Sequence, residues 1–230
     1  MTKIILYRRD GACSWVANAL LRHLSIPFEA VLMIPGPDSR FFEAADGSFT
    51  HEEYRKNVNP DGRVPTLVVD GEIITELPAI LTMIAQLAPD RKPGEAVLGK
   101  TPLERARVVE WTVWLSGTLQ AAGFGGYFRP YRFAGTHEEA YPAVKEKGRR
   151  VIESCFERVD ARLTGREYAV GDALTIVDIN LYVFWAWGVI AGFPMRERFP
   201  AYAQLLRRVE ALDSVRAAVK DEGMTPIFES

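Results

Sequence analysis

Short apolar runs and helix-spaced apolar positions alternate over the first part of the chain. Residues 3–7 form an apolar run that predicts a buried strand, and apolar positions from Val16 to Leu24 recur on one helix face. Pro27 ends this helix before a second apolar run at 28–33, which predicts another strand. The pattern therefore predicts a β-α-β unit.

A β-hairpin is predicted where two further apolar runs flank Asp70-Gly71, a dipeptide that favours the positive φ angles of a tight turn. The first run is entered through Val64-Pro65, and proline is confined to strand starts, edges and bulges because it cannot donate to the sheet. An X–Pro bond also adopts the cis form at a cost of only about 0.5–1 kcal/mol. An ordinary trans turn and a cis bond that directs backbone groups toward a ligand both fit this spacing.

The chain turns almost wholly helical after 89–100, a proline-containing stretch that is expected to be a linker. Thr101 and Glu104 then form a capping-box sequence, with a proline at the first helical position. We therefore expect two domains, one α/β over 1–88 and one all-α over 101–230.

A second capping box joins Thr175 to Asp178 at the start of the apolar run 179–187. The Asp178 carboxylate can satisfy backbone N–H groups that this run would otherwise bury without partners. We interpret Asp178 as a folding residue and not as a catalytic one.

Composition and charge narrow the class of protein. With 230 residues, 48% of them hydrophobic, the chain can bury a sizeable core, and a net charge of −2 argues against a nucleic-acid-binding protein. No apolar run reaches the roughly 20 residues of a membrane span. Residues 1–5 lead directly into a strand and do not resemble a cleavable signal. A cytoplasmic protein without a membrane partner is expected.

The cysteines and histidines exclude two kinds of site. Cys13 and Cys155 have no paired spacing, which suits a reducing compartment, and Cys155 is expected to be a packing residue. The absence of a Cys-x-x-Cys motif argues against a dithiol oxidoreductase. His23, His51 and His137 are scattered, so no metal site is expected.

Cys13 and Ser14 open the first predicted helix. Unpaired N–H groups and the positive end of the helix dipole favour an anionic sulfur at such a position. This placement can lower the pKa of a cysteine from about 8.5 into a range of roughly 3.5–7.5. A cysteine in a first helical turn also serves as a small apolar filler, so the position alone leaves both readings open.

Together these features resemble the glutathione transferase superfamily over nearly the whole chain. The resemblance implies a thioredoxin-like α/β domain that binds glutathione, followed by an all-helical domain that binds the second substrate. It also implies glutathione as co-substrate and a homodimer.

The same resemblance implies a set of glutathione-binding residues. In this family a cis-proline before the third strand presents backbone groups to the cysteinyl part of glutathione, which places Arg63, Val64 and Pro65 at the ligand. An acidic residue after the fourth strand holds the γ-glutamyl amine, and Glu76 matches it. Leu77 stands where the family usually has serine, so a hydroxyl contact to the γ-glutamyl carboxylate is lost, although a backbone N–H there could still serve.

The class within the superfamily stays open. Cys13 resembles the bacterial beta class, whereas Ser14 beside it resembles the zeta class, in which a serine activates glutathione. No histidine occupies 119–122, where the beta class carries one. Either Cys13 or Ser14 is expected to donate a hydrogen bond to the glutathione sulfur, with Tyr7 as a weaker candidate.

An aromatic set in the helical half is expected to line the electrophile pocket. A stripe of this kind is also common in a helical core, so each member has both readings. The candidates are Trp111, Trp114, Phe124, Tyr127 and Phe128.

The leading hypothesis is a glutathione transferase that holds the glutathione thiol as thiolate for attack on a small apolar electrophile. If Cys13 is itself the nucleophile, thiol transfer or deglutathionylation through a mixed disulfide replaces this reaction. A zeta-like isomerase and a non-catalytic glutathione-fold binding protein are further alternatives. The loop 36–50 has no assigned role: disorder, a cover for the glutathione site and a dimer surface all fit its composition.

Overall fold

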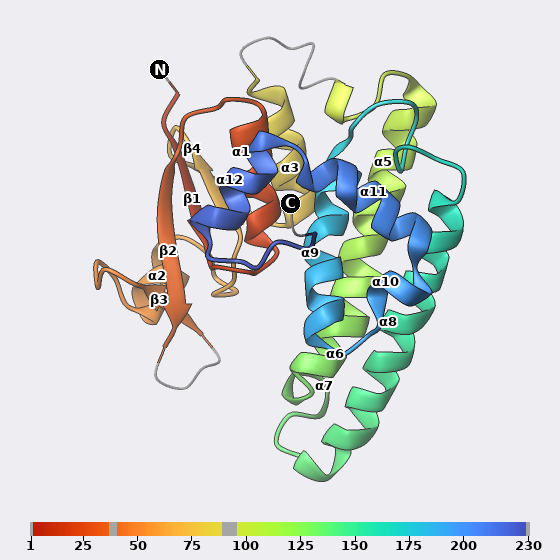
Figure 1. Cartoon of the computed structure of the whole chain (residues 1–230). Coiled ribbons are helices and arrows are strands. Elements are labelled where there is room, and N and C mark those ends of the chain that lie inside the picture. Colours follow the sequence, from red (N-terminus) through yellow and green to blue (C-terminus); the bar gives the residue numbers. More distant parts are fainter. Residues whose placement is uncertain (1, 37–40, 89–95, 229–230) are drawn as a thin grey trace. The chain divides into compact units, whose positions relative to one another are not determined.

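Figure 1 shows a computed structural model of the chain, which describes residues 2–36, 41–88 and 96–228. Its contacts form two compact units. Met1–Leu98 and Arg208–Ser230 make up the first, here called the sheet unit, and Gly99–Arg207 make up the second, the helical unit.

The described part of the sheet unit contains a five-stranded mixed sheet in the order β3-β2-β1-β4-β5. β1 pairs with β2 in parallel, and the other pairings are antiparallel. This arrangement confirms the predicted thioredoxin-like α/β fold. The strands are β1 (Ile4–Arg8), β2 (Glu29–Pro35), β3 (Phe42–Ala44), β4 (Thr66–Val69) and β5 (Glu72–Ile74).

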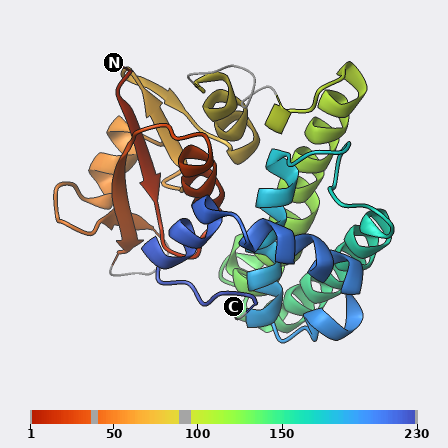
Figure 2. The same ribbon diagram turned by 45° about the horizontal axis from the view of Figure 1, so that its top comes forward.

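Helices cover both faces of this sheet. Figure 2 shows the orange α2 on one side, with α1, α3 and α12 on the other. α1 packs against β1, α3 and α12, and its residues from Ser14 to Leu21 are all buried. Side chains alternate across β1, so Leu6 faces the α1 side while Tyr7 faces Tyr54 of α2, with ring centroids 5.4 Å apart. The helices are α1 (Ser14–His23), α2 (His51–Asn57), α3 (Leu77–Gln86) and α12 (Asp213–Asp221).

The helical unit is built around the long helix α8 and the buried helix α9. Within the described residues, no helix combines the length and the apolarity needed to span a membrane. The elements are α5 (Pro102–Trp114), the π-helix η1 (Leu115–Phe124), α6 (Gly125–Phe128), α7 (Tyr131–Ala134), the 3₁₀ helix η2 (Glu138–Ala140), α8 (Tyr141–Leu163), α9 (Ile176–Ile190), α10 (Met195–Arg198) and α11 (Pro200–Glu210).

The predicted capping role of Asp178 is confirmed. Its carboxylate accepts hydrogen bonds from Thr175 N at 2.7 Å and from Ala169 N at 2.7 Å, and it is fully buried. Burial raises the pKa of Asp178 to about 6. The residue therefore ties the loop before α9 to the first turn of that helix.

The two units divide the chain differently from the domains expected from the sequence. Residues 208–230, expected in the all-α domain, group with the sheet unit because α12 packs against α1. Of the expected linker, 89–95 lies outside the described residues. Of the loop 36–50, residues 42–44 form β3 at the edge of the sheet, and 37–40 lie outside the described residues.

A close crossing of α8 with the end of η1 and with α6 depends on Gly148. A Cβ atom at Gly148 would lie 2.6 Å from Tyr127 N and 2.8 Å from Gly123 O. Both are backbone atoms, which cannot rotate away as a side-chain end would. The absence of a side chain at Gly148 is therefore required for these helices to pack at this distance.

We expect Gly148→Ala to lower the free energy of unfolding by about 2 kcal/mol or more, because the added methyl overpacks a backbone contact. Chemical denaturation measures the change. Gly117→Ala is the matched control: nothing lies within 4 Å of its Cβ position, and alanine in a helix is expected to stabilise by up to about 1 kcal/mol. Equal stability of the two variants would contradict the close crossing.

Candidate functional site

The turn after β1 presents Cys13 at the start of α1. Ser14, which is fully buried, accepts a hydrogen bond from Arg9 N at 3.0 Å and donates its hydroxyl proton to Arg9 O at 3.1 Å. Ala12 N also donates to Arg9 O, at 3.1 Å. The Ser14 hydroxyl is thus committed to the backbone of the turn that carries Cys13.

The thiol of Cys13 meets the segment that precedes β4. Its Sγ donates to Val64 O at 3.6 Å, and only 6% of the residue is exposed. The Val64-Pro65 peptide bond is cis, which decides between the two conformations left open by the sequence. The structure therefore brings together Cys13 and Val64, two residues from separate parts of the predicted site.

Tyr54 of α2 fixes the backbone next to this peptide. Its hydroxyl donates to Arg63 O at 2.7 Å and lies 2.9 Å from Thr66 Oγ1, while Asn59 Nδ2 donates to Arg63 O at 3.0 Å. Burial raises the pKa of Tyr54 to about 12, so the phenol stays a neutral donor. The sequence analysis missed Tyr54 and Asn59, because nothing in their local pattern points to a carbonyl in a later segment.

Strand register gathers the predicted glutathione residues at one edge of the sheet. Tyr7 lies opposite Thr66 in the antiparallel pair β1–β4, so the end of β1 lies beside the start of β4. Leu67 lies opposite Ile74 in the antiparallel pair β4–β5, so β5 ends at the same edge. The segments next to these strand ends carry Cys13, Arg63, Val64, Pro65 and Glu76.

Glu76 holds an unusual backbone conformation directly before α3. Its φ is +67°, in a region that non-glycine residues rarely adopt, and its carbonyl accepts the hydrogen bond of Ile80 N at 3.0 Å. The residue is exposed, whereas Leu77 after it is buried. Backbone conformations of this kind cluster at ligand sites, where the surrounding structure maintains them.

Tyr7 lies on a different face of the sheet from α1. Its ring packs against Phe49 at 5.9 Å and Tyr54 at 5.4 Å between centroids. Burial, with a smaller contribution from Glu29, raises the pKa of Tyr7. The structure thus places Tyr7 on the α2 face, whereas Cys13 opens the helix on the opposite face.

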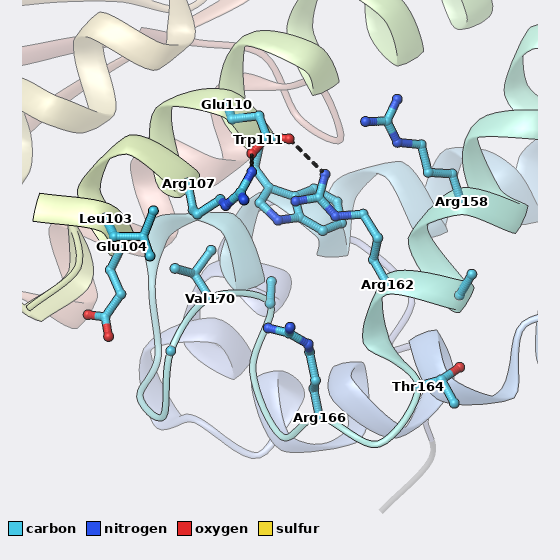
Figure 3. Close-up of a pocket in the computed structure, with 13 residues that line it drawn as sticks. Leu103, Glu104, Arg107, Glu110, Trp111, Arg158, Arg162, Thr164, Arg166 and Val170 are labelled. Atoms are coloured by element: carbon cyan, nitrogen blue, oxygen red, sulfur yellow. Dashed lines mark hydrogen bonds and ion pairs between the residues drawn. The ribbon is translucent and has the colours of Figure 1, made fainter. Parts of the chain in front are cut away.

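The five aromatic side chains expected to line one pocket fall into two groups. Trp111 and Trp114 contact each other at 5.7 Å between centroids, and Trp111 lines a polar pocket together with Arg162 (Figure 3). Phe124, by contrast, is 2% exposed and stacks on Phe128 at 5.6 Å. Phe128 in turn contacts Tyr127 at 5.1 Å, which completes the second group.

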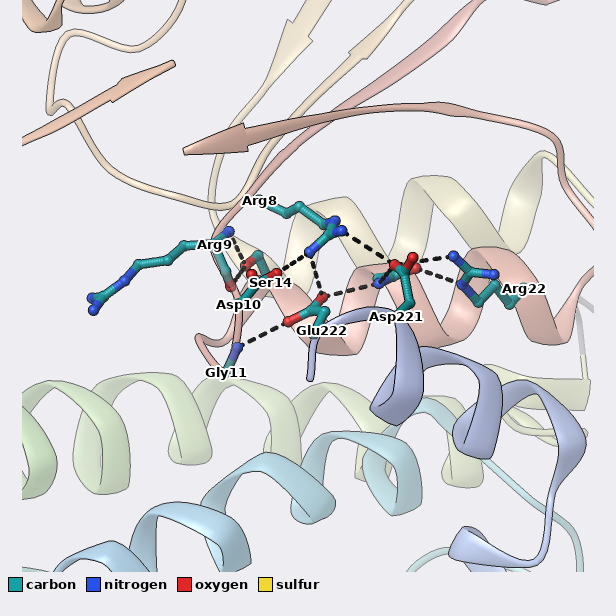
Figure 4. Close-up of polar contacts among 9 residues, drawn as sticks. Arg8, Arg9, Asp10, Gly11, Ser14, Arg22, Asp221 and Glu222 are labelled. Carbon is teal, nitrogen blue, oxygen red and sulfur yellow. Dashed lines mark hydrogen bonds and ion pairs between the residues drawn. The ribbon is translucent and has the colours of Figure 1, made fainter. Parts of the chain in front are cut away.

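A buried polar network from α12 supports the turn that carries Cys13 (Figure 4). Glu222, directly after α12, accepts hydrogen bonds from Gly11 N at 3.0 Å and from Asn18 Nδ2 at 2.9 Å. Arg8 pairs with Glu222 at 3.6 Å and with Asp221 at 3.2 Å. The sequence analysis missed this network, whose partners lie about 200 residues apart and leave no local signal.

The Glu222 side chain is completely buried, and this burial raises the pKa of its carboxyl to about 7. The hydrogen bond from Asn18 and the charge of Arg8 act in the opposite direction without cancelling the effect of burial. Between pH 4.5 and pH 7 the folded chain therefore keeps a proton that the unfolded chain releases. The free energy of unfolding must fall as the pH rises through this window.

We expect wild type to lose up to about 3 kcal/mol of stability relative to Glu222→Gln between pH 4.5 and pH 7, at about 1.4 kcal/mol for each pH unit. The glutamine keeps an acceptor for Gly11 N and has no proton to lose. Denaturant unfolding at a series of pH values measures the difference. Glu146→Gln, at an exposed position of α8, is the control and should run parallel to wild type. A parallel curve for Glu222→Gln would show that Glu222 is not protonated in the folded chain.

Comparison with known proteins places these features in a family. Residues 11–87 match the glutathione S-transferase N-terminal domain, and residues 126–213 match the glutathione S-transferase C-terminal domain. Glutathione S-transferase GST-4.5 of Xanthomonas campestris pv. campestris is 29% identical over 95% of this chain and 98% of its own length. The uncharacterized GST-like protein YncG of Escherichia coli is 30% identical over 80% of this chain and 82% of its own.

Solved structures agree with these matches. A bacterial beta class glutathione S-transferase of Sphingomonas chungbukensis is 30% identical with a TM-score of 0.77, over 96% of this chain and all of that one. A sphingomonad glutathione S-transferase complexed with glutathione is 29% identical with a TM-score of 0.77 over the same shares. The chain combines a cis peptide bond before β4 with an acidic residue before α3 and a thiol at the start of α1. It belongs to the glutathione S-transferase family.

Proposed function

We propose that this chain is a glutathione transferase that binds glutathione at the sheet edge whose adjoining segments carry Cys13, Val64 and Glu76. The strand register supports this site, because the segments that carry the three residues adjoin neighbouring ends of β1, β4 and β5. The distance of 3.6 Å between Cys13 Sγ and Val64 O is the observation that carries the proposal, since both groups would face the glutathione cysteinyl part.

Each part of glutathione has a counterpart in this site. The backbone of Val64 pairs with the cysteinyl part, and the exposed carboxylate of Glu76 pairs with the γ-glutamyl amine. Leu77 offers no hydroxyl, so the γ-glutamyl carboxylate accepts from backbone N–H groups at the start of α3. The buried Leu77 side chain supports this assignment, because only the backbone of that residue is left for the ligand.

Cys13 is the better candidate for support of the glutathione sulfur. The Ser14 hydroxyl exchanges two hydrogen bonds with the Arg9 backbone, at 3.0 and 3.1 Å, and is fully buried. The Cys13 thiol donates more weakly, to Val64 O at 3.6 Å, so a ligand thiolate can replace that acceptor at the positive end of α1. A thiolate of glutathione held there attacks the electrophile, and the thiolate form is the nucleophilic one. The near-complete burial of Cys13 favours this supporting role over direct attack on a bulky disulfide.

The second substrate is a small apolar electrophile. The group formed by Phe124, Tyr127 and Phe128 supports an apolar pocket, since Phe128 is 39% exposed at the edge of the aromatic core. Trp111 and Trp114 are not part of this proposed pocket, because both contact arginine side chains.

The proposal also includes a homodimer of this chain, located in the cytoplasm. Val109 and Val113 of α5 are 58% and 57% exposed, and a second copy of the chain would remove this apolar surface from water. Cys13 and Cys155 are thiols and not half-cystines, which fits a reducing compartment.

Titration calorimetry with glutathione tests the binding site. Glu76→Gln is expected to weaken binding about tenfold or more, because a hydrogen bond between charged groups is worth about 1.5–3 kcal/mol. Glu72→Gln, at an exposed position of β5 four residues before Glu76, should bind as wild type does. If Glu76→Gln binds glutathione with unchanged affinity, the placement of the ligand is wrong.

Ultraviolet thiolate absorbance of bound glutathione, followed with pH, tests the role of Cys13. Cys13→Ala should raise the pKa of the bound thiol and lower kcat/KM toward 1-chloro-2,4-dinitrobenzene by about 10–100-fold, through the loss of one hydrogen bond to a charged sulfur. Cys155→Ala is the control, since burial raises the pKa of Cys155 to about 11 and leaves it a thiol. An unchanged thiolate in Cys13→Ala, with a glutathione mixed disulfide on wild type by intact mass, would assign thiol transfer instead.

A further inference from the structure

An arginine-lined pocket lies in the helical unit between α5, the end of α8 and the loop before α9 (Figure 3). Its volume of about 680 Å³ falls within the range of small-molecule sites, roughly 300–1,000 Å³. All of its lining residues belong to Gly99–Arg207, and none belongs to the proposed glutathione site. Leu103, Ala161, Ala169 and Val170 supply its apolar side chains.

The pocket carries a surplus of positive charge. Four of its lining residues are arginines and two are glutamates, a difference of two charges. Glu110 accepts from Arg107 Nη1 at 2.6 Å and pairs with Arg162 at 3.5 Å, and Figure 3 shows its carboxylate between these two guanidinium groups. The Glu104 carboxylate serves the backbone instead, at 2.6 Å from Lys100 N.

Two tryptophan rings hold arginines at the pocket. The guanidinium carbon of Arg162 lies 3.9 Å from the ring centroid of Trp111, and that of Arg158 lies 4.6 Å from the centroid of Trp114. Trp111 is only 1% exposed and forms part of the wall. Such stacking keeps the guanidinium groups oriented before any ligand arrives, which reduces the entropy lost on binding.

Arg162 responds to this environment. Burial lowers its pKa, and the positive charges of Arg158, Arg107 and Arg166 lower it further, against the opposing charge of Glu110. The guanidinium groups thus repel one another in a partly enclosed space. A bound anion would relieve this repulsion.

We propose that this pocket binds a phosphomonoester whose phosphate is attached to a flat aromatic or apolar group. A phosphomonoester carries a charge of about −1.5 to −2 at neutral pH, which matches the surplus of two positive charges. Guanidinium groups bind phosphate oxygens in a bidentate manner. The exposed side chains of Leu103 and Ala161 accommodate the remainder of the molecule.

Titration calorimetry of the full-length protein with 1-naphthyl phosphate tests this site. We expect saturable binding that is unchanged in the presence of saturating glutathione and at least tenfold tighter than the binding of neutral 1-naphthol. Arg158→Gln and Arg107→Gln should each weaken binding of the phosphate about tenfold. Arg150→Gln is the matched control, because Arg150 lies on α8, pairs with Glu146 and does not line the pocket.

Arg158→Gln leaves the ion pair between Glu110 and Arg162 intact. If this variant has the melting temperature of wild type, its loss of phosphate binding is due to the lost ligand contact. Equal affinity for 1-naphthol and its phosphate would overturn the proposal, as would unchanged binding in both arginine variants. If glutathione displaces 1-naphthyl phosphate, the probe binds at the glutathione site and not in this pocket. Binding that appears only when sedimentation shows the chain to be monomeric would assign the pocket to a second copy of the chain and equally overturn the proposal.

Discussion

The antiparallel pairing of β4 with both β1 and β5 determines where the proposed glutathione site lies. Because β4 runs opposite to its two neighbours, its first two residues lie beside the ends of both, with Thr66 opposite Tyr7 and Leu67 opposite Ile74. The thiol-bearing turn, the segment before β4 and the start of α3 therefore converge, and Cys13 Sγ donates to Val64 O at 3.6 Å between the first two. A shift of one residue in either pairing would turn every side chain to the other face of the sheet and separate Cys13 from Val64.

Each unit contains a buried carboxyl group that accepts hydrogen bonds from backbone N–H groups. Asp178 does this at the start of α9, and Glu222 does it for the turn before α1. Burial raises the pKa of each, and the hydrogen bonds that each accepts act in the opposite direction. The two carboxyl groups differ in how far along the chain their hydrogen-bond donors lie. Asp178 serves its own helix, whereas Glu222 returns from the far end to support the turn beside Cys13.

The parts of the fold that could be predicted from the sequence depend on local chemistry. The Asp70-Gly71 turn, the Thr175–Asp178 box and the helix that begins beside Cys13 each follow from a few neighbouring residues. The parts that could not be predicted depend on where a side chain points in three dimensions. Nothing local to Ser14 shows that its hydroxyl bonds Arg9 and is thereby unavailable to a ligand. Likewise, Tyr54 carries no sequence signal for its bond to Arg63 O.

The π-helix η1 explains why the expected aromatic pocket divides into two groups. The sequence analysis expected all five aromatic side chains to line one pocket, and no local pattern indicated a π-helix between them. In η1 the hydrogen bonds run from residue i to i+5, so each turn holds more residues than an α-helical turn. The buried residues of η1 are Leu115, Leu119, Gly123 and Phe124. By the end of η1 the face of the helix has rotated relative to an uninterrupted α-helix. Phe124 and Phe128 consequently pack in the aromatic core, whereas Trp111 and Trp114 contact arginines of α8. One continuous helical segment thereby contributes side chains to two chemically different environments.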